Sequence, residues 1–219
     1  MIVEENGIRF QVIQGKATAI GFSDSHKGTT VNIPEVISNG YRVIAIGKNA
    51  FARTARITSV FLPTSIHRIE HSAFYNCIGL REVHMAKSNT EKQYCQIERY
   101  AFAMCGDLEE IDMPALLFMH QQACILCRKL QYITGPIINL GSSAFSECKK
   151  IERIFFANDA EIKKGAVEQS SIASVVFIGD AAVSVDVLDT FYNTNTTIYC
   201  NKDANVAEAV HYGLNVEFI

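Results

Sequence analysis

Residues 97–114 read IERYAFAMCGDLEEIDMP, and this stretch decides the fold. It places Ile97 four positions before an Ala-Phe pair, Cys105 three positions after the phenylalanine, and Leu108 three positions after the cysteine. An apolar-x-apolar pair and a proline close the stretch at residues 111–114. The same order of residues recurs at regular steps along most of the chain, so the stretch is one unit of an internal repeat.

The Ala-Phe pair marks each copy of the repeat. Cys124 replaces the phenylalanine in the fourth copy, and Val167 replaces it in a weaker sixth copy. The steps between successive alanines are 23, 28, 22, 21 and 22 residues. Because a coil of about 22 residues cannot bury its own apolar flanks, this period predicts a solenoid of stacked coils that share one core. The alanines of the six copies are Ala50, Ala73, Ala101, Ala123, Ala144 and Ala166.

Each coil is expected to contain one half-buried strand. Val60 and Leu62 alternate with Ser59 and Phe61, which is the pattern of a strand with one buried face. A proline follows and ends the strand, since proline cannot donate to a ladder of hydrogen bonds. Successive coils would place these strands side by side in a parallel sheet. The Ala-Phe segments would form the opposite wall, with the phenylalanine rings inside.

The repeat resembles that of the BspA-like, or treponemal-type, leucine-rich repeats. Their units follow the pattern I-x-x-x-A-F-x-x-C-x-x-L-x-x-I-x-L-P, and the cleanest matches here are residues 69–85 and 97–114. The resemblance implies a β-rich, right-handed, horseshoe-like solenoid with a parallel sheet on its concave face. Members of the family are typically surface-exposed binding or adhesion proteins, so the resemblance also implies a recognition role.

We expect one solenoid domain over residues 1–219. Irregular N-terminal coils that cap the stack are expected over 1–45, regular repeats over 46–178, and a degenerate coil with a C-terminal cap over 179–219. In the last part, Ile198–Cys200 would be a closing strand and Ala204–Tyr212 a short helix. Residues 86–96 account for the step of 28 residues, and they are expected to project as a polar loop, either as a neutral insertion or as a functional one.

Composition excludes several classes of protein. The chain has 219 residues, a net charge of −3 and 48% hydrophobic residues, which argues against disorder and gives no footprint for nucleic acid or an anionic membrane. No apolar run is long enough for membrane insertion. The seven cysteines are an odd number, which favours free thiols in a reducing compartment. Because residues 1–7 do not resemble a secretory signal, two locations stay open: the cytoplasm, or the cell surface for a chain whose signal precedes Met1.

Motifs with known chemistry are weak. Cys124 and Cys127 form a CxxC, a spacing that redox and zinc sites use, but both fall in repeat columns and are therefore expected in the core. The cysteine column as a whole would be a buried ladder of free thiols. His67 and His71 flank Ile69 in an extended segment, so we expect them to be solvated. We accordingly predict no enzyme, no metal site and no cofactor.

The outward face of the predicted sheet is the best candidate for function. Exposed aromatic side chains are frequent at recognition surfaces, and an acidic centre would favour a basic segment of a partner. This predicts recognition of a protein, or of a glycan, through the concave sheet. The alternative is a purely structural or scaffolding solenoid, on which exposed apolar groups are ordinary. The candidate residues are Phe61, Glu82, His84, Glu110, Asp112, Tyr132, Arg153 and Phe155.

Overall fold

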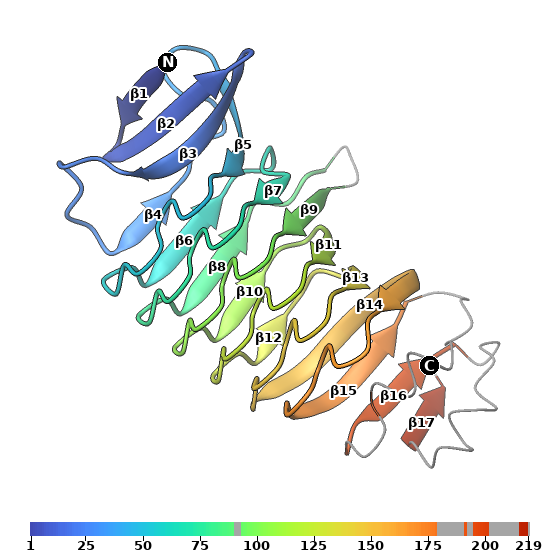
Figure 1. Cartoon of the computed structure of the whole chain (residues 1–219). Helices are drawn as coiled ribbons and strands as arrows, with labels where there is room; N and C mark the ends of the chain where they lie inside the picture. The colour runs from blue at the N-terminus through green and yellow to red at the C-terminus, as the bar shows by residue number, and fades with distance from the viewer. Residues whose placement is uncertain (90–92, 179–190, 192–194, 202–214, 219) are drawn as a thin grey trace.

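The computed structural model describes residues 1–89, 93–178, 191, 195–201 and 215–218. In this part of the chain, short strands wind into a parallel β-solenoid whose coils stack along one axis (Figure 1). Each regular coil has three sides, which are a strand of a first sheet, a strand of a second sheet, and a wall of tight turns. We number the regular coils 1 to 6 by the alanines of the repeat, from Ala50 to Ala166.

The first sheet is the one that the apolar alternation predicts. Its neighbouring strands are parallel and in register, so that Val60 pairs with Val83, and Val83 pairs with Ile111. The repeat columns therefore stack one above another, which confirms the predicted solenoid. The strands are β4 (Thr30–Asn32), β6 (Ser59–Leu62), β8 (Glu82–Met85), β10 (Glu110–Asp112), β12 (Tyr132–Ile133), β14 (Ile151–Ile162), β15 (Ile172–Phe177), β16 (Thr197–Cys200) and β17 (Asn215–Phe218).

The second sheet was not predicted as a separate sheet. It is built on the column of aliphatic residues that precede each alanine by four positions, and Ile46 pairs with Ile69, which pairs with Ile97. The end of β14 turns the corner and joins it, because Glu161 and Ile162 pair with β13. The other strands are β3 (Lys16–Phe22), β5 (Arg42–Ile46), β7 (Arg68–Ile69), β9 (Tyr94–Ile97), β11 (Leu116–Met119) and β13 (Ile137–Leu140).

The turn wall carries the Ala-Phe pairs. In coils 1 to 5 the amide of the phenylalanine position donates to the alanine carbonyl of the next coil, as from Phe74 to Ala101 at 2.8 Å. The rings form one interior row, with Phe51 and Phe102 each 5.3 Å from Phe74 between centroids. Phe145 is also fully buried, two coils further on. The turn wall consists of residues 49–53, 72–76, 100–104, 122–126, 143–147 and 165–169.

Left-handed backbone recurs at two positions of the turn wall. One is the residue before each alanine and the other lies three positions after it, as in Tyr100 (φ 61°) and Met104 (φ 63°). This conformation is uncommon for large side chains. At Met104 it aims the amide at the next coil, where the amide donates to the carbonyl of Ile125 at 2.9 Å. The bond between coils therefore compensates for the unfavourable φ.

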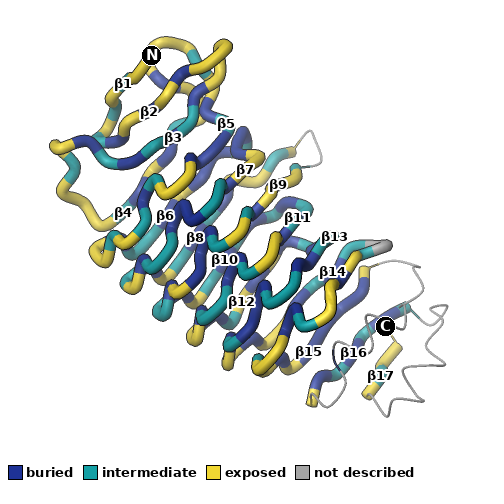
Figure 2. Tube along the Cα trace, viewed as in Figure 1, coloured by how far each residue is buried: buried dark blue, intermediate teal, exposed yellow. Residues whose placement is uncertain are grey.

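The cysteine column is a buried ladder of free thiols, as predicted. Every cysteine of the chain is free and buried. Each thiol of the column donates to a backbone carbonyl of the preceding coil, as from Cys77 to Phe51 and from Cys127 to Phe102, both at 3.1 Å. The cysteines therefore satisfy carbonyl groups inside the stack. Figure 2 shows the buried residues as a continuous band through the stacked coils.

The N-terminal segment is built differently from the irregular coils that we expected. The strands β1 (Ile2–Glu5), β2 (Ile8–Ile13) and β3 pair antiparallel in sequence, and β3 then pairs parallel with β5. The connections are two-residue turns at residues 6–7 and 14–15, in which all four residues have positive φ. Turns of this kind match the twist of a hairpin, and Asn6-Gly7 is a strong hairpin signal.

Two other expectations meet the structure only in part. The projecting loop predicted for residues 86–96 is shorter at its C-terminal side, since Tyr94 to Gln96 already belong to β9; residues 90–92 lie outside the described part. The closing strand at Ile198–Cys200 is present as part of β16. The short helix at 204–212 and most of the degenerate coil at 180–195 lie outside the described residues. No helix in the described part of the chain is long and apolar enough to span a membrane.

Candidate binding surface on the first sheet

The side chains on the outer face of the first sheet have the orientation that the alternation predicts. In β6, Val60 and Leu62 are buried, whereas Phe61 is 43% exposed. The strands β8, β10 and β12 follow the same alternation, with buried Val83, Ile111 and Ile133. We use the name acidic-aromatic surface for the outward residues Phe61, Glu82, His84, Glu110, Asp112, Tyr132, Arg153 and Phe155.

A chain of polar contacts crosses three strands of this surface and ends at Thr134, the residue after β12. The imidazole of His84 lies between two carboxylates, with Nε2 3.2 Å from Glu82 Oε2 and Nδ1 3.5 Å from Asp112 Oδ2. The hydroxyl of Ser59 donates to the other oxygen of Glu82 at 2.6 Å, and the hydroxyl of Thr134 donates to the other oxygen of Asp112 at 2.7 Å. Each carboxylate oxygen therefore has a partner, which holds both acidic groups in place.

This arrangement changes the pKa of His84 and of Glu82. Partial burial of His84 disfavours its charged form, but the hydrogen bonds with Glu82 and Asp112 outweigh that effect and raise the pKa of the imidazole. A neutral imidazole can donate from one nitrogen only, whereas the imidazolium donates from both. The hydrogen bond from Ser59, followed by that with His84, lowers the pKa of Glu82. The centre of the surface thus favours a protonated His84 beside an ionised Glu82.

Aromatic side chains extend the surface on both sides of this centre. The ring of Phe61 stacks on His84, with 5.3 Å between centroids and an interplanar angle of 19°. On the other side, the hydroxyl of Tyr132 donates to Glu152 at 3.0 Å. The guanidinium of Arg153 lies over the ring of Tyr199, 5.9 Å from its centroid. These contacts restrict the rotamers of side chains that would otherwise be free in solvent.

An open hollow of about 680 Å³ lies at the C-terminal side of the surface. Three predicted residues line it, which are Tyr132, Arg153 and Phe155. Glu152 and Tyr199 also line it, and the sequence analysis did not single them out. The signal for Tyr199 was its place in the outward column, because it pairs with Val176 of β15. The sequence before β16 departs from the repeat pattern, which obscured that column.

Two outward positions of β15 are buried rather than exposed. Ser174 and Val176 continue the outward columns of the first sheet, but their exposed fractions are only 8% and 9%. The Nε of Arg153 donates to the hydroxyl of Ser174 at 3.2 Å and covers it. Val176 pairs between Phe155 and Tyr199, so a large aromatic residue lies on each side of it. At this end of the acidic-aromatic surface, the larger side chains of neighbouring strands therefore cover the small outward residues of β15.

The residues with weaker sequence signals do not form a reactive site. Cys124 and Cys127 are fully buried, and burial raises the pKa of both thiols, which opposes a nucleophilic role. His67 stacks on Tyr94 at 5.0 Å, whereas His71 contacts the edge of Tyr100. Within the described residues, no group of three or more histidine, cysteine or acidic side chains could hold a metal ion.

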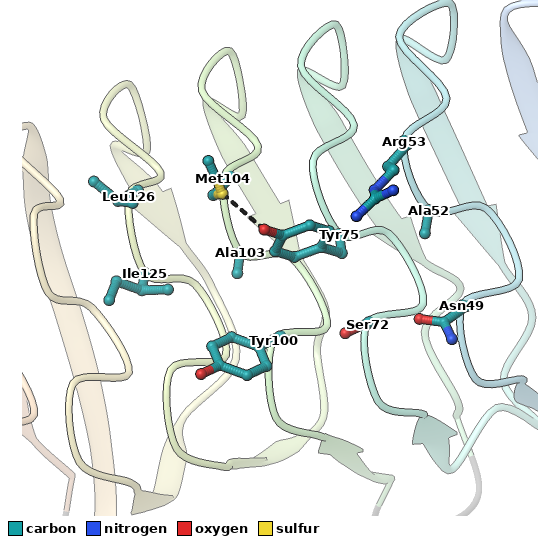
Figure 3. Close-up of a pocket in the computed structure, with 10 residues that line it drawn as sticks. All are labelled: Asn49, Ala52, Arg53, Ser72, Tyr75, Tyr100, Ala103, Met104, Ile125 and Leu126. Carbon is teal, nitrogen blue, oxygen red and sulfur yellow. Dashed lines mark hydrogen bonds between the residues drawn. The ribbon is translucent and has the colours of Figure 1, made fainter.

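The sequence analysis missed a second hollow, on the turn wall of coils 1 to 4. It has a volume of about 750 Å³, and its lining is largely apolar (Figure 3). The repeat columns do not predict this hollow, because its lining side chains project from the left-handed positions of the turns and from the residues between them. The lining residues are Asn49, Ala52, Arg53, Ser72, Tyr75, Tyr100, Ala103, Met104, Ile125 and Leu126.

Comparisons with known proteins agree with this architecture. The crystal structure of a leucine rich cell surface protein from Faecalibacterium prausnitzii aligns with a TM-score of 0.70 at 21% identity, over 94% of this chain and 55% of that one. The pneumococcal vaccine antigen PcpA aligns at 0.59 and 16% identity, over 95% and 68% of the two chains. A leucine rich repeat protein of T. pallidum aligns at 0.56 and 19% identity, over 99% and 97%.

These structural likenesses establish the fold, and the chain spans 55% of the length of the Faecalibacterium protein. No curated protein matched the chain. The model of the BspA type leucine rich repeat region (6 copies) matches residues 18–113, 44–173 and 87–197. With most of its length matched and its coils stacked in register, the chain belongs to the BspA type leucine-rich-repeat family, whose solenoids are generally non-enzymatic.

Proposed function

We propose that this protein is a non-enzymatic binding protein that recognises a partner protein through the acidic-aromatic surface. The observation that carries the proposal is the chain of contacts from Ser59 through Glu82, His84 and Asp112 to Thr134. Side chains that are already held in one arrangement lose less conformational entropy when a partner binds. A surface of this kind is suited to recognition, in contrast to a set of independently mobile surface residues.

The charges of the surface favour a partner segment with basic residues. Glu82, Glu110 and Asp112 lie on two neighbouring strands, and Glu152 lies near the hollow at the other end. Phe61, Tyr132 and Phe155 provide aromatic area on which apolar or cationic side chains can pack. The relation to a Faecalibacterium cell surface protein supports a role in recognition at a cell surface.

The alternative is a scaffolding solenoid without a dedicated ligand, and one triple variant separates the two. Phe61→Ala, Asp112→Asn and Phe155→Ala together remove aromatic area and one carboxylate from the surface. A matched control, Ile13→Ala, Asp24→Asn and Ile178→Ala, removes exposed groups of similar kind elsewhere.

The test measures binding of lysine-containing and aromatic-containing peptides, and capture of partner proteins, for the wild type and both variants. We expect the surface variant to lose capture of a partner that the wild type and the control retain. Equal capture by all three proteins would remove the proposed role of this surface and favour the scaffolding alternative.

A further inference from the structure

The hollow on the turn wall is a second candidate site, on a different side of the coils from the acidic-aromatic surface. Tyr75 of coil 2, Tyr100 and Met104 of coil 3, and Ile125 and Leu126 of coil 4 form its apolar walls (Figure 3). The hydroxyl of Tyr75 donates to the sulfur of Met104 at 3.1 Å. The rings of Tyr75 and Tyr100 are nearly perpendicular, with 6.4 Å between centroids. These contacts fix the walls of the hollow.

The fold does not require large apolar side chains at these positions. In coil 5 the position equivalent to Tyr100 is Ser143, and the position equivalent to Ile125 is Ser146. Glu147 stands there where coils 3 and 4 have Met104 and Leu126, and all three residues share a left-handed φ between 63° and 65°. The same backbone is therefore compatible with polar residues. The apolar side chains of the hollow are therefore not needed for the turn itself, and Met104 is 39% exposed.

Arg53 is the one charged side chain among the residues that line the hollow, and Arg99 lies beside the lining residue Tyr100. Arg53 lines the hollow on the side of coil 1, and no carboxylate among the described residues lies within ion-pair distance of it. Arg99 lies against the ring of Tyr100, 4.7 Å from its centroid, and donates to its hydroxyl and to Gln122. Within the described part of the chain, Arg99 also has no ion pair. The rim thus has positive charge available for a ligand.

We propose that this hollow binds a segment of a partner protein that carries an apolar side chain flanked by aspartate or glutamate. The apolar side chain would pack among Tyr75, Tyr100 and Met104, and methionine adapts its shape to such contacts. The flanking carboxylates would pair with Arg53 and Arg99, since guanidinium groups bind carboxylates with two parallel hydrogen bonds. The turn wall therefore selects an acidic segment, whereas the acidic-aromatic surface selects a basic one.

A defined peptide tests the proposal. The probe is a hexapeptide with a central tryptophan-leucine pair between glutamates, and the counterpart has lysines in place of the glutamates. Because the chain has no tryptophan, the fluorescence of the peptide can be followed selectively. We expect the glutamate peptide to bind about tenfold tighter than the lysine peptide, and we expect salt to reduce the difference.

Variants of the protein locate the binding. Met104→Asn with Leu126→Gln places in the hollow the residues that Asn76 and Gln169 supply at the same backbone position of other coils, so the fold is retained. Arg53→Glu reverses the charge. We expect each of these variants to bind the glutamate peptide about tenfold more weakly than the wild type. Glu147→Gln, which lies outside the hollow, should leave the affinity unchanged. The triple variant of the acidic-aromatic surface should also leave it unchanged, so the two proposals can fail independently.

Three results would overturn the proposal. One is equal affinity for the glutamate and lysine peptides, and another is unchanged affinity in the Met104→Asn/Leu126→Gln variant. The third concerns a second copy of this chain as the occupant. If sedimentation detects a dimer that this variant abolishes, the hollow is an interface between copies and not a site for an acidic segment.

Discussion

The thiol of Cys105 donates a hydrogen bond to the backbone carbonyl of Phe74, one coil earlier, with 3.1 Å between sulfur and oxygen. The same carbonyl accepts the amide of Cys77 within its own coil at 3.2 Å. Cysteine is thus small enough for the core and still offers a donor to the neighbouring coil. The column links coils through side chains as well as through backbone hydrogen bonds.

Replacing Cys105 by alanine should therefore destabilise the protein by about 1–2 kcal/mol, because a buried sulfur and its hydrogen bond are both lost. Cys95→Ala is the matched control, since Cys95 is equally buried but the hydrogen bond from its thiol to the carbonyl of Gln96 is longer, at 3.8 Å. The denaturation midpoints of the two variants measure the difference. Equal shifts would mean that the bond to Phe74 adds nothing to packing.

The cysteines should resist thiol reagents in the folded protein. All seven are buried and free, and burial raises the pKa of Cys95 to about 12 and that of Cys105, Cys127 and Cys148 well above the usual range. The thiolate is the reactive form, so both access and ionisation oppose reaction at these four cysteines. A hydrogen bond with Cys105 lowers the pKa of Cys77, so that thiol is protected by its burial alone. A colorimetric thiol titration should detect almost no reaction at neutral pH and seven thiols after denaturation. Rapid reaction of the native chain would contradict this packing.

The phenylalanine row supports the core more strongly than the cysteines do. Phe102 is fully buried and stacks on Phe74 with an interplanar angle of only 4°. Phe102→Ala should lower the free energy of unfolding by about 3–5 kcal/mol, because the rigid coils on both sides cannot collapse into the cavity. Phe61→Ala on the outer face should change it by about 0.5 kcal/mol or less. A thermal melt that Phe102→Ala leaves unchanged would place that ring outside the core.

Much of the solenoid was predictable because each repeat column has the same type of residue at the same position of several coils. In the repeat columns, the phenylalanines, the cysteines and the alanines from Ala73 to Ala166 are all buried, whereas Ala50 is partly buried. The Val60 and Leu62 columns correspond to the first sheet. The second sheet escaped prediction because a strand such as β7 has two residues, too few for an alternation to be visible. Asn6-Gly7 is a signal for the hairpin between β1 and β2, but we interpreted the N-terminal segment as further coils of the solenoid.

The site was less predictable than the fold. Alternation along a strand indicates that Glu82, His84 and Asp112 point outward, and this orientation is confirmed. It does not indicate that His84 reaches both carboxylates, because that depends on register between strands and on rotamers. The turn-wall hollow depends on left-handed backbone at Met104 and Leu126, a conformation that the residue types themselves disfavour.

Close approach of coils should make the replacement of Gly79 destabilising. A Cβ at Gly79 would lie 2.2 Å from the carbonyl oxygen of Ala55, a backbone atom of the preceding coil that cannot move aside alone. Gly79→Ala should cost about 1–3 kcal/mol through this overlap. Gly106→Ala is the control, because a Cβ there would meet nothing within 4 Å. Similar denaturation midpoints for the two variants would contradict the tight contact at Gly79.

Stability should depend on pH through His84. Its pKa in the folded state lies above the ordinary value of 6.5, because its hydrogen bonds with Glu82 and Asp112 outweigh the effect of burial. Glu110, on the neighbouring strand, adds to the attraction. Since folding favours the protonated form, this contribution is fully present below pH 6.5 and is lost as the pH rises through the higher folded-state value.

Glu82 has the opposite sign, because its folded-state pKa lies below 4.5, so its contribution is present above pH 4.5 and is lost at lower pH. The two contributions therefore coincide between pH 4.5 and 6.5, where the cluster should stabilise the fold most. His84→Gln should remove the decline above that window, as measured by chemical denaturation across the pH range, while His67→Gln retains it. NMR titration of His84 gives the independent check, and a pKa at or below 6.5 would refute the bridging geometry.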